Sequence, residues 1–265
     1  MARVRLDWLL TERGLAASVT EAEALIHAGR VDLEGERRLK PGQLVAPDAS
    51  VVLVEGPRWA SRAGAKLEHG LDEFRIDPRG LACLDAGAST GGFTDVLIAR
   101  GARVVYAVDV GRAQLIQRLR DDPRVVSMER TNLRELRELP EPIDLATLDL
   151  SFIGLRAVLS AVRNLLSDTG RVVALVKPQF ELPQDLVPRG GVVTDPDGWR
   201  QAIDSVAGSA NDAGLQPVGA VRSPVTGADG TVEVLVHLRC GGSADPTFAA
   251  SVDTAVNEPG PTSSG

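Results

Sequence analysis

Residues 81–110, LACLDAGASTGGFTDVLIARGARVVYAVDV, indicate the fold that we predict for most of the chain. It contains an apolar run of strand length, a glycine-rich turn, a helix-length segment and a second apolar run that leads to Asp109. Two nearly continuous apolar strands joined by a helix are typical of a parallel sheet covered on both faces. The stretch therefore predicts an α/β fold with a doubly wound sheet.

The same alternation of strands and helices extends from residue 61 to about residue 240. Helices are expected over 61–74, 91–101, 111–120, 152–166 and 198–213. Strands are expected over 81–87, 102–110, 124–130, 142–150, 171–177, 216–222 and 231–239. The loop SPVTGADG separates the last two strands, so we expect a hairpin whose last strand is antiparallel in a mostly parallel sheet.

The composition of the 265-residue chain is that of an ordinary globular protein, with 43% hydrophobic and 25% charged residues. No apolar run approaches the ~18 residues of a membrane span, and no apolar signal segment follows Arg3, so a cytoplasmic protein is expected. Cys83 and Cys240 fit a reducing compartment, and three scattered histidines give no support to a metal site. The net charge of -7 argues mildly against nucleic-acid binding unless basic residues cluster on one surface.

The glycine-rich turn has the spacing G-x-x-x-G-G, which fits neither the dinucleotide fingerprint nor a phosphate-binding P-loop. Asp85, just before the first glycine, suits a ligand with an ammonium group and would repel a pyrophosphate. Asp109 ends the next strand, where an acid can accept hydrogen bonds from ribose hydroxyls. A nucleoside that carries an amino acid meets both demands, which points to S-adenosylmethionine. Each feature alone also occurs in other sheets of this kind, so their order together favours this ligand.

Lysine is rare in this chain, because Lys40, Lys66 and Lys177 are the only lysines among 29 basic residues. Lys177 ends one apolar run and Asp149 ends another. The carboxyl ends of parallel strands meet at one edge of a sheet, so these two side chains are expected to pair near the methyl donor. A buried lysine can lose its proton whereas an arginine cannot, so Lys177 is a candidate to deprotonate or orient a sugar hydroxyl. A plain salt bridge at the strand ends is the alternative.

Lys66 and Glu233 extend this pair to a set of four. The order Lys66, Asp149, Lys177, Glu233 resembles the catalytic K-D-K-E tetrad of the FtsJ-like ribose 2'-O-methyltransferases. The stretches SRAGAKL, LDAGASTGGFTD, DVGRAQL, DLSFI, LVKPQFE and GGVVTDP resemble the TlyA family of rRNA 2'-O-methyltransferases, also called haemolysin A. This resemblance implies a class I, Rossmann-like methyltransferase that uses S-adenosylmethionine to methylate rRNA riboses, those of cytidines in small- and large-subunit rRNA. The residues that we assign to the cofactor site are Asp85, Gly87, Ser89, Thr90, Gly91, Gly92, Phe93, Asp109, Asn132 and Asp149.

The first 56 residues form a separate α+β module in this prediction. Helices are expected over 5–14 and 18–29, the second opened by a Ser18–Glu21 capping box, with short strands after them. The segments RLDWLL, EALIHAGRVDLEG and KPG resemble the S4 RNA-binding domain, but Val19 stands where many such domains have arginine. The phosphate-binding candidates that this resemblance implies are Arg3, Arg5, Arg13, Arg30, Arg37, Arg38 and Lys40.

The predicted domain order is an S4-type domain over 1–56, a linker over 57–61, an FtsJ-like domain over 62–240 and a tail over 241–265. The tail is small, polar and rich in glycine and proline, so we expect it to be disordered. Ribosomal RNA or ribosomal subunits are the expected partners. Two alternatives stay open: an inactive RNA-binding or ribosome assembly factor, and a membrane-lytic haemolysin, although no amphipathic lysine-rich segment supports lysis.

Overall fold

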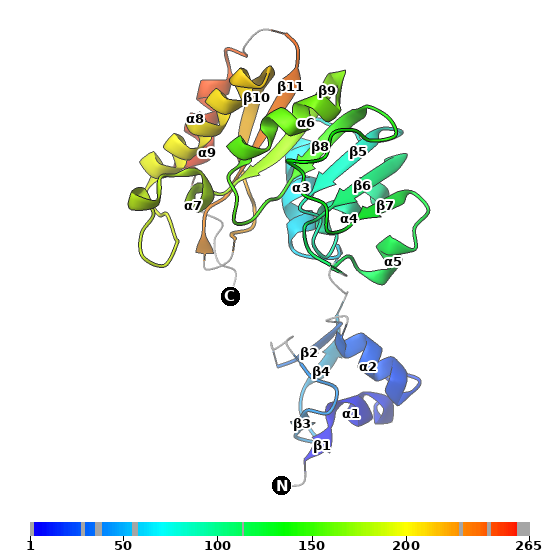
Figure 1. Ribbon diagram of the computed structural model, residues 1–265. Coiled ribbons are helices and arrows are strands. Elements are labelled where there is room, and N and C mark those ends of the chain that lie inside the picture. Colours follow the sequence, from blue (N-terminus) through cyan, green and yellow to red (C-terminus); the bar gives the residue numbers. More distant parts are fainter. Residues whose placement is uncertain are drawn as a thin grey trace. The chain divides into compact units, whose positions relative to one another are not determined.

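The computed structural model describes residues 3–27, 30–34, 39–54, 58–112, 114–227, 230–242 and 245–258. The chain divides into two compact units, Met1–Arg58 and Trp59–Gly265 (Figure 1). Each unit has hydrophobic clusters of its own, which is the mark of a separate domain.

The smaller unit packs two helices beside two short antiparallel strand pairs. The helices are α1 (Leu6–Glu12) and α2 (Val19–His27), and the strands pair as β1 (Val4–Arg5) with β3 (Leu44–Val45) and β2 (Val31–Leu33) with β4 (Val51–Leu53). The Ser18 cap of the predicted capping box is present, since the Glu21 amide donates to Ser18 Oγ at 3.1 Å and so satisfies one amide of the first turn of α2. The Glu21 side chain accepts from the Ala17 amide at 2.6 Å instead of from the amide of Ser18.

The larger unit is built on one sheet, which in the described residues has seven strands in the order β10-β11-β9-β8-β5-β6-β7 (Figure 1). β11 is antiparallel to both of its neighbours and the other neighbouring pairs are parallel, which confirms the predicted hairpin. The strands are β5 (Ala82–Ala86), β6 (Val104–Val108), β7 (Val125–Met128), β8 (Ile143–Leu148), β9 (Leu166–Val176), β10 (Leu215–Arg222) and β11 (Val234–Cys240). The helices are α3 (Ala63–Glu73), α4 (Gly92–Ala99), α5 (Gln117–Arg120), α6 (Leu159–Leu165), α7 (Pro178–Glu181), α8 (Pro196–Asp212) and α9 (Phe248–Asn257), with 3-10 turns at Leu155–Ala157 and Gln184–Leu186.

Both faces of this sheet are covered, as the continuous apolar strands predict. Alternate residues of a strand point to opposite faces. On one face Cys83 and Leu145 belong to the cluster that contains the buried residues of α3 and α4. On the other face Leu84 and Ala146 belong to the cluster that contains those of α6, α8 and α9. The carboxyl ends of β5, β6, β8 and β9 are therefore presented together at one edge between two packed layers.

The tail predicted to be disordered instead contains helix α9, so that prediction is wrong for 245–258. Val252, Ala255 and Val256 form an i, i+3, i+4 stripe that is at most 3% exposed and packs into the larger core. Ser251 Oγ accepts a hydrogen bond of 2.9 Å from the Ala220 amide of β10, the strand at the edge of the sheet. Small and polar residues separate the apolar ones in this segment, so its composition predicted disorder although the apolar residues have helical spacing.

Two further boundaries differ from the prediction. The helix expected over 111–120 begins only at Gln117, because the Gly111 amide bonds to Asp109 Oδ1 at 2.6 Å and the chain after β6 forms a loop. Trp59 and Ala60, assigned to the linker, belong to the larger unit. Trp59 is 9% exposed, and the Ala60 amide donates to Asp95 Oδ2 of α4 at 2.7 Å.

Candidate active site

The glycine-rich turn between β5 and α4 brings its main chain close to the end of β8. Gly87 has φ +86°, and a Cβ atom there would lie 2.3 Å from the main-chain oxygen of Asp149. Gly91, which precedes α4, has φ +101°. Only glycine adopts such angles without strain, and at Gly87 only glycine leaves room for the neighbouring strand. The turn can thus present main-chain groups to a ligand at this edge of the sheet.

A cavity of about 620 Å³ opens beside this turn, within the usual range for a site that encloses a small molecule. Its lining includes five of the predicted cofactor residues, namely Gly87, Ser89, Asp109, Asn132 and Asp149. Val110, 74% exposed, and Phe152, 93% exposed, add apolar surface to the same lining. The cavity therefore combines apolar walls with acidic and amide groups, as a nucleoside requires.

Asp109 organises the loops around this cavity. Its Oδ2 accepts from the Ser89 amide at 2.8 Å and its Oδ1 accepts from the Gly111 amide at 2.6 Å. Each carboxylate oxygen can accept more than one hydrogen bond, so both retain capacity for ligand hydroxyls. The amide side chain of Asn132 is oriented by a 2.7 Å bond to Glu135 Oε1.

Asp85 does not line this cavity, and its predicted contact with a ligand's ammonium group stays a prediction. Its side chain is fully buried, because strand alternation turns it toward α4, where Thr94 Oγ1 donates to Oδ2 at 2.6 Å. Thr147 Oγ1 lies 3.4 Å from Oδ1. Burial raises the pKa of Asp85 to about 7; the Thr94 hydrogen bond opposes this shift and the charge of Asp149 adds to it.

A second cavity, of about 220 Å³, shares part of its lining with the first and holds the predicted lysine. Lys177 Nζ lies 2.7 Å from Asp149 Oδ1, so the two strand-end charges form the expected pair. Lys177 Nζ also donates to Ser151 Oγ at 3.2 Å. The Lys177 and Asp149 side chains are 12% and 16% exposed, so they are largely shielded and yet open to the cavity. The ion pair lies where the two cavities meet, because Asp149 lines both.

Lys66 of α3 and Glu233, which directly precedes β11, form a second ion pair, between Nζ and Oε2. Their side chains are 10% and 4% exposed, and neither lines the two cavities. A Cβ atom at Gly227 would lie 2.6 Å from Glu233 Oε1, so the loop before β11 closes over this carboxylate. The four predicted catalytic residues are thus arranged as two ion pairs, one at the cavities and one beneath the surface.

The remaining candidates in the glycine-rich turn divide between the cavities and the core. Thr90, Gly92 and Phe93 line the smaller cavity, and Gly91 lines neither. The sequence did not single out Ser61 and Ser151, which also line it. Ser151 comes two residues after Asp149 at the same strand end, and that position was the available signal.

The phosphate-binding candidates of the smaller unit differ in how free their side chains are. Those placed at the surface of that unit are Arg3, Arg5, Arg13, Arg30 and Lys40. The Arg13 guanidinium donates to the main-chain oxygens of Ala49 and Pro47 at 2.7 and 2.6 Å, so it holds a loop of the unit together. Arg37 and Arg38 lie outside the described residues.

A covered parallel sheet with one antiparallel strand, a glycine-rich turn after β5 and an acid after β6 together define a class I methyltransferase domain. The model of the FtsJ-like methyltransferases matches residues 59–240, and the model of the S4 domain matches residues 4–51. A 16S/23S rRNA (cytidine-2'-O)-methyltransferase TlyA from Mycobacterium tuberculosis is 45% identical over 243 residues, 89% of this chain and 90% of that protein. The chain therefore belongs to the TlyA family of FtsJ-like methyltransferases.

Other relatives agree with this assignment. Hemolysin A of Brachyspira hyodysenteriae is 35% identical over 241 residues, which cover 89% of this chain and 99% of that one. A solved hemolysin-named protein from Streptococcus thermophilus has a TM-score of 0.75 at 37% identity, covering 97% of this chain and 95% of its own. An S-adenosylmethionine-dependent methyltransferase from Mesorhizobium loti shares the fold, with a TM-score of 0.51 at 18% identity over 66% of this chain and 97% of its own.

The described ranges also bear on membranes and metals. None of their helices combines the length and the apolarity that a bilayer crossing requires. In the same ranges, no three His, Cys, Asp or Glu side chains gather in a way that could hold a metal ion.

Proposed function

We propose that this protein transfers the methyl group of S-adenosylmethionine to the ribose 2'-hydroxyl of cytidines in 16S and 23S rRNA, in the cytoplasm. The observation that carries the proposal is the ion pair of Lys177 and Asp149, 2.7 Å apart, where the two cavities meet. It gives a proton-handling group next to a nucleoside-sized cavity. The names of the relatives described above support the choice of rRNA and of cytidine.

The residues around the larger cavity fit S-adenosylmethionine. Asp109 has free acceptor capacity for ribose hydroxyls, and Val110 offers an exposed apolar surface for a base. The glycine turn brings main chain to the cavity without side chains in the way. When bound, S-adenosylmethionine supplies an activated methyl group, so the protein's task is chiefly to position the acceptor.

Lys177 is the residue that we assign to the acceptor hydroxyl. As an ammonium group it would donate a hydrogen bond to the 2'-oxygen and orient it, and only as the neutral amine would it take up the hydroxyl proton, while Asp149 and Ser151 fix the position of Nζ. Lys66 and Glu233 would support the nucleotide's surroundings, because their buried pair ties α3 to the segment before β11. The acceptor nucleotide would reach Lys177 from the smaller cavity, whose glycine-turn side remains assigned to the cofactor.

The proposal is tested by transfer of radiolabelled methyl from S-adenosylmethionine to rRNA and to ribosomal subunits. A 2'-O-methyl group blocks alkaline cleavage, so mapping by alkali resistance identifies the atom that is methylated. We expect Lys177→Arg, which keeps the positive charge, to lower kcat at least about a hundredfold because arginine cannot exchange its proton. Arg103→Lys is the matched control, because it exchanges the same two residue types away from the cavities. Arg103 directly precedes β6 and its side chain is 53% exposed, so this substitution should leave kcat unchanged.

One outcome would count against the role of Lys177, and two would count against the function itself. Full activity of Lys177→Arg would leave the ion pair as a structural salt bridge only. Binding of S-adenosylmethionine and rRNA without transfer would favour an inactive assembly factor. Release of dye from liposomes by the purified protein, without transfer to any RNA, would favour a membrane-lytic protein.

A further inference from the structure

Helix α1 of the smaller unit carries an exposed aromatic side chain that does not contribute to the core. Trp8 is 63% exposed, whereas Leu6, Leu9 and Leu10 of the same helix are at most 3% exposed. Helix packing is thus complete without the indole. A large apolar ring at the surface of an RNA-binding type of domain needs a separate explanation.

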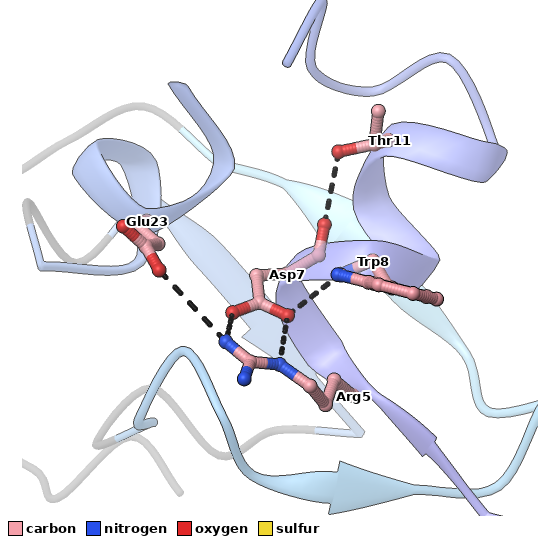
Figure 2. A network of polar contacts seen from close by, with 5 residues as sticks. All are labelled: Arg5, Asp7, Trp8, Thr11 and Glu23. Carbon is pink, nitrogen blue, oxygen red and sulfur yellow. Dashed lines mark hydrogen bonds and ion pairs between the residues drawn. The ribbon is translucent and has the colours of Figure 1, made fainter. Parts of the chain in front are cut away.

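Next to Trp8, Asp7 holds the side chain of Arg5 in one orientation (Figure 2). Arg5 Nε donates to Asp7 Oδ1 at 3.0 Å and Nη2 donates to Oδ2 at 2.5 Å, a bidentate pair. The Asp7 side chain is fully buried and Arg5 is 48% exposed. The hydrogen bonds from Arg5 hold the pKa of Asp7 below its usual range, so the pair stays charged.

Asp7 also connects this pair to Trp8. Its Oδ1 accepts from the Trp8 main-chain amide at 2.8 Å, and its main-chain oxygen accepts from Thr11 Oγ1 at 3.0 Å (Figure 2). The bonds to Asp7 use Nε and Nη2 of Arg5, so within the described residues Nη1 is left for a ligand. Glu23, the other acid nearby, lies 3.9 Å from Nη2 and is 43% exposed.

We propose that Trp8 and Arg5 form a binding site for one unpaired nucleotide of the rRNA, with Asp7 as the positioning residue. The indole would stack on the base, and Arg5 would contact a phosphate. Only an unpaired base exposes a face to a side chain in this way, and the planar guanidinium fits a phosphate. This inference rests on the proposed function, because it takes rRNA as the substrate.

Substitution of Trp8 and of Asp7 distinguishes a specific nucleotide site from general electrostatic attraction. We expect Trp8→Ala to weaken rRNA binding about tenfold, and Trp8→Phe to restore most of the affinity. Asp7→Asn removes an acid, which on charge alone would strengthen RNA binding. We expect it instead to weaken binding about fivefold, because Arg5 loses its orientation.

Two substitutions in the same unit serve as matched controls. Val52→Ala truncates another apolar side chain, which is 51% exposed, and should leave the affinity within about twofold of the wild type. Asp48→Asn removes the same charge from an exposed position and should not weaken rRNA binding. Circular dichroism verifies that each variant is folded.

Tryptophan fluorescence tests the wild-type protein directly, even if Asp7→Asn fails to fold. Trp59 and Trp199 are 9% and 7% exposed, so acrylamide should quench chiefly Trp8. Saturating protein-free rRNA should shield the accessible part of the emission. The inference is overturned if rRNA binds and the quenching is unchanged, or if Trp8→Ala binds as tightly as Val52→Ala.

The other possible outcomes distinguish failure of the proposed nucleotide site from failure of the proposed function. Shielding by ribosomal subunits, but not by protein-free rRNA that is bound, would assign the indole to a ribosomal protein and overturn the base contact. A wild-type protein that neither binds nor methylates rRNA or subunits would remove the proposed function itself. Methyl transfer with Trp8 unshielded would remove only the inference.

Discussion

Burial decides what each carboxylate near the cavities can do. Asp109 lines the larger cavity and keeps acceptor capacity for a ligand, whereas Asp85 is enclosed beneath the glycine turn. The buried Asp85 accepts a hydrogen bond from Thr94 and so joins β5 to the first turn of α4. Two acids that look equivalent in the sequence therefore have different surroundings, one facing the cavity and one enclosed within the fold.

The raised pKa of Asp85 predicts a pH dependence of stability. The pKa is about 7 in the folded state against 3.8 for the unperturbed group, so folding favours the protonated acid. Its contribution to stability is fully present below pH 3.8 and is lost as the pH rises to about 7. Relative to wild type, Asp85→Asn should therefore gain stability with rising pH, by up to about 1.4 kcal/mol per pH unit in this range.

Urea unfolding of the wild type and of Asp85→Asn between pH 5 and pH 7 measures the difference in their free energies of unfolding. Groups that ionise in both proteins contribute equally and cancel in this difference. A difference in unfolding free energy that stays constant over this range would contradict a raised pKa for Asp85.

At the level of elements, helix α9 packs against the edge of the sheet although the composition of its segment predicts disorder. β10 lies at the edge of the sheet, and α9 packs against it with a three-residue apolar stripe. An ion pair of 2.5 Å between Arg200 of α8 and Asp253 of α9 adds a polar tie at the surface. The helix is part of the methyltransferase core although it follows residue 240.

The contribution of α9 can be measured with one charge placed on either side of the helix. Val252→Asp buries a carboxylate at a position that is 1% exposed and should lower the free energy of unfolding by at least about 3 kcal/mol. Thr254→Asp puts the same group on the exposed side and should change it by less than about 0.5 kcal/mol. Thermal or urea unfolding decides, and equal losses in the two variants would contradict the packing of α9 on the sheet.

At the level of the whole molecule, the net charge of -7 and an RNA substrate are compatible if the phosphate contacts are local. Arg3, Arg5, Arg30 and Lys40 lie at the surface of the smaller unit, which has its own core. Charge changes there should therefore alter RNA affinity without disturbing the cavities of the larger unit. The net charge of the whole chain therefore does not show whether one unit carries the phosphate contacts.

The salt dependence of rRNA binding tests this division. Replacing Arg3, Arg30 and Lys40 together with alanine should reduce the slope of log affinity against log salt by about two to three, if each neutralises one phosphate. The Kd for S-adenosylmethionine should not change. Arg79→Ala removes a 79% exposed arginine just before β5 in the larger unit and serves as the control, with an unchanged slope expected. An unchanged slope in the triple variant would remove these residues from the interface.

Features of the fold that depend on local sequence pattern could be predicted, whereas features that depend on side-chain contacts between elements could not. The spacing of the apolar residues predicted that both faces of the sheet are covered. Because the carboxyl ends of parallel strands meet at one edge of a sheet, the sequence also predicted that Lys177 and Asp149 pair. The helix predicted over 111–120 begins only at Gln117, because the periodicity of this segment does not reveal the hydrogen bond that the Gly111 amide donates to Asp109. The orientation of Asp85 was missed for the same kind of reason, since its partner Thr94 belongs to the next element.

The α/β fold class, the antiparallel hairpin and the edge of the sheet at which the candidate site residues gather follow from the sequence alone. These follow from periodicity and from chain direction, both of which are local. The tertiary structure alone decided that Asp85 is buried, that α9 completes the core and that the tetrad forms two separate ion pairs. Those features depend on which side chains from distant segments exclude water from one another, and burial of that kind is a property of the packed molecule.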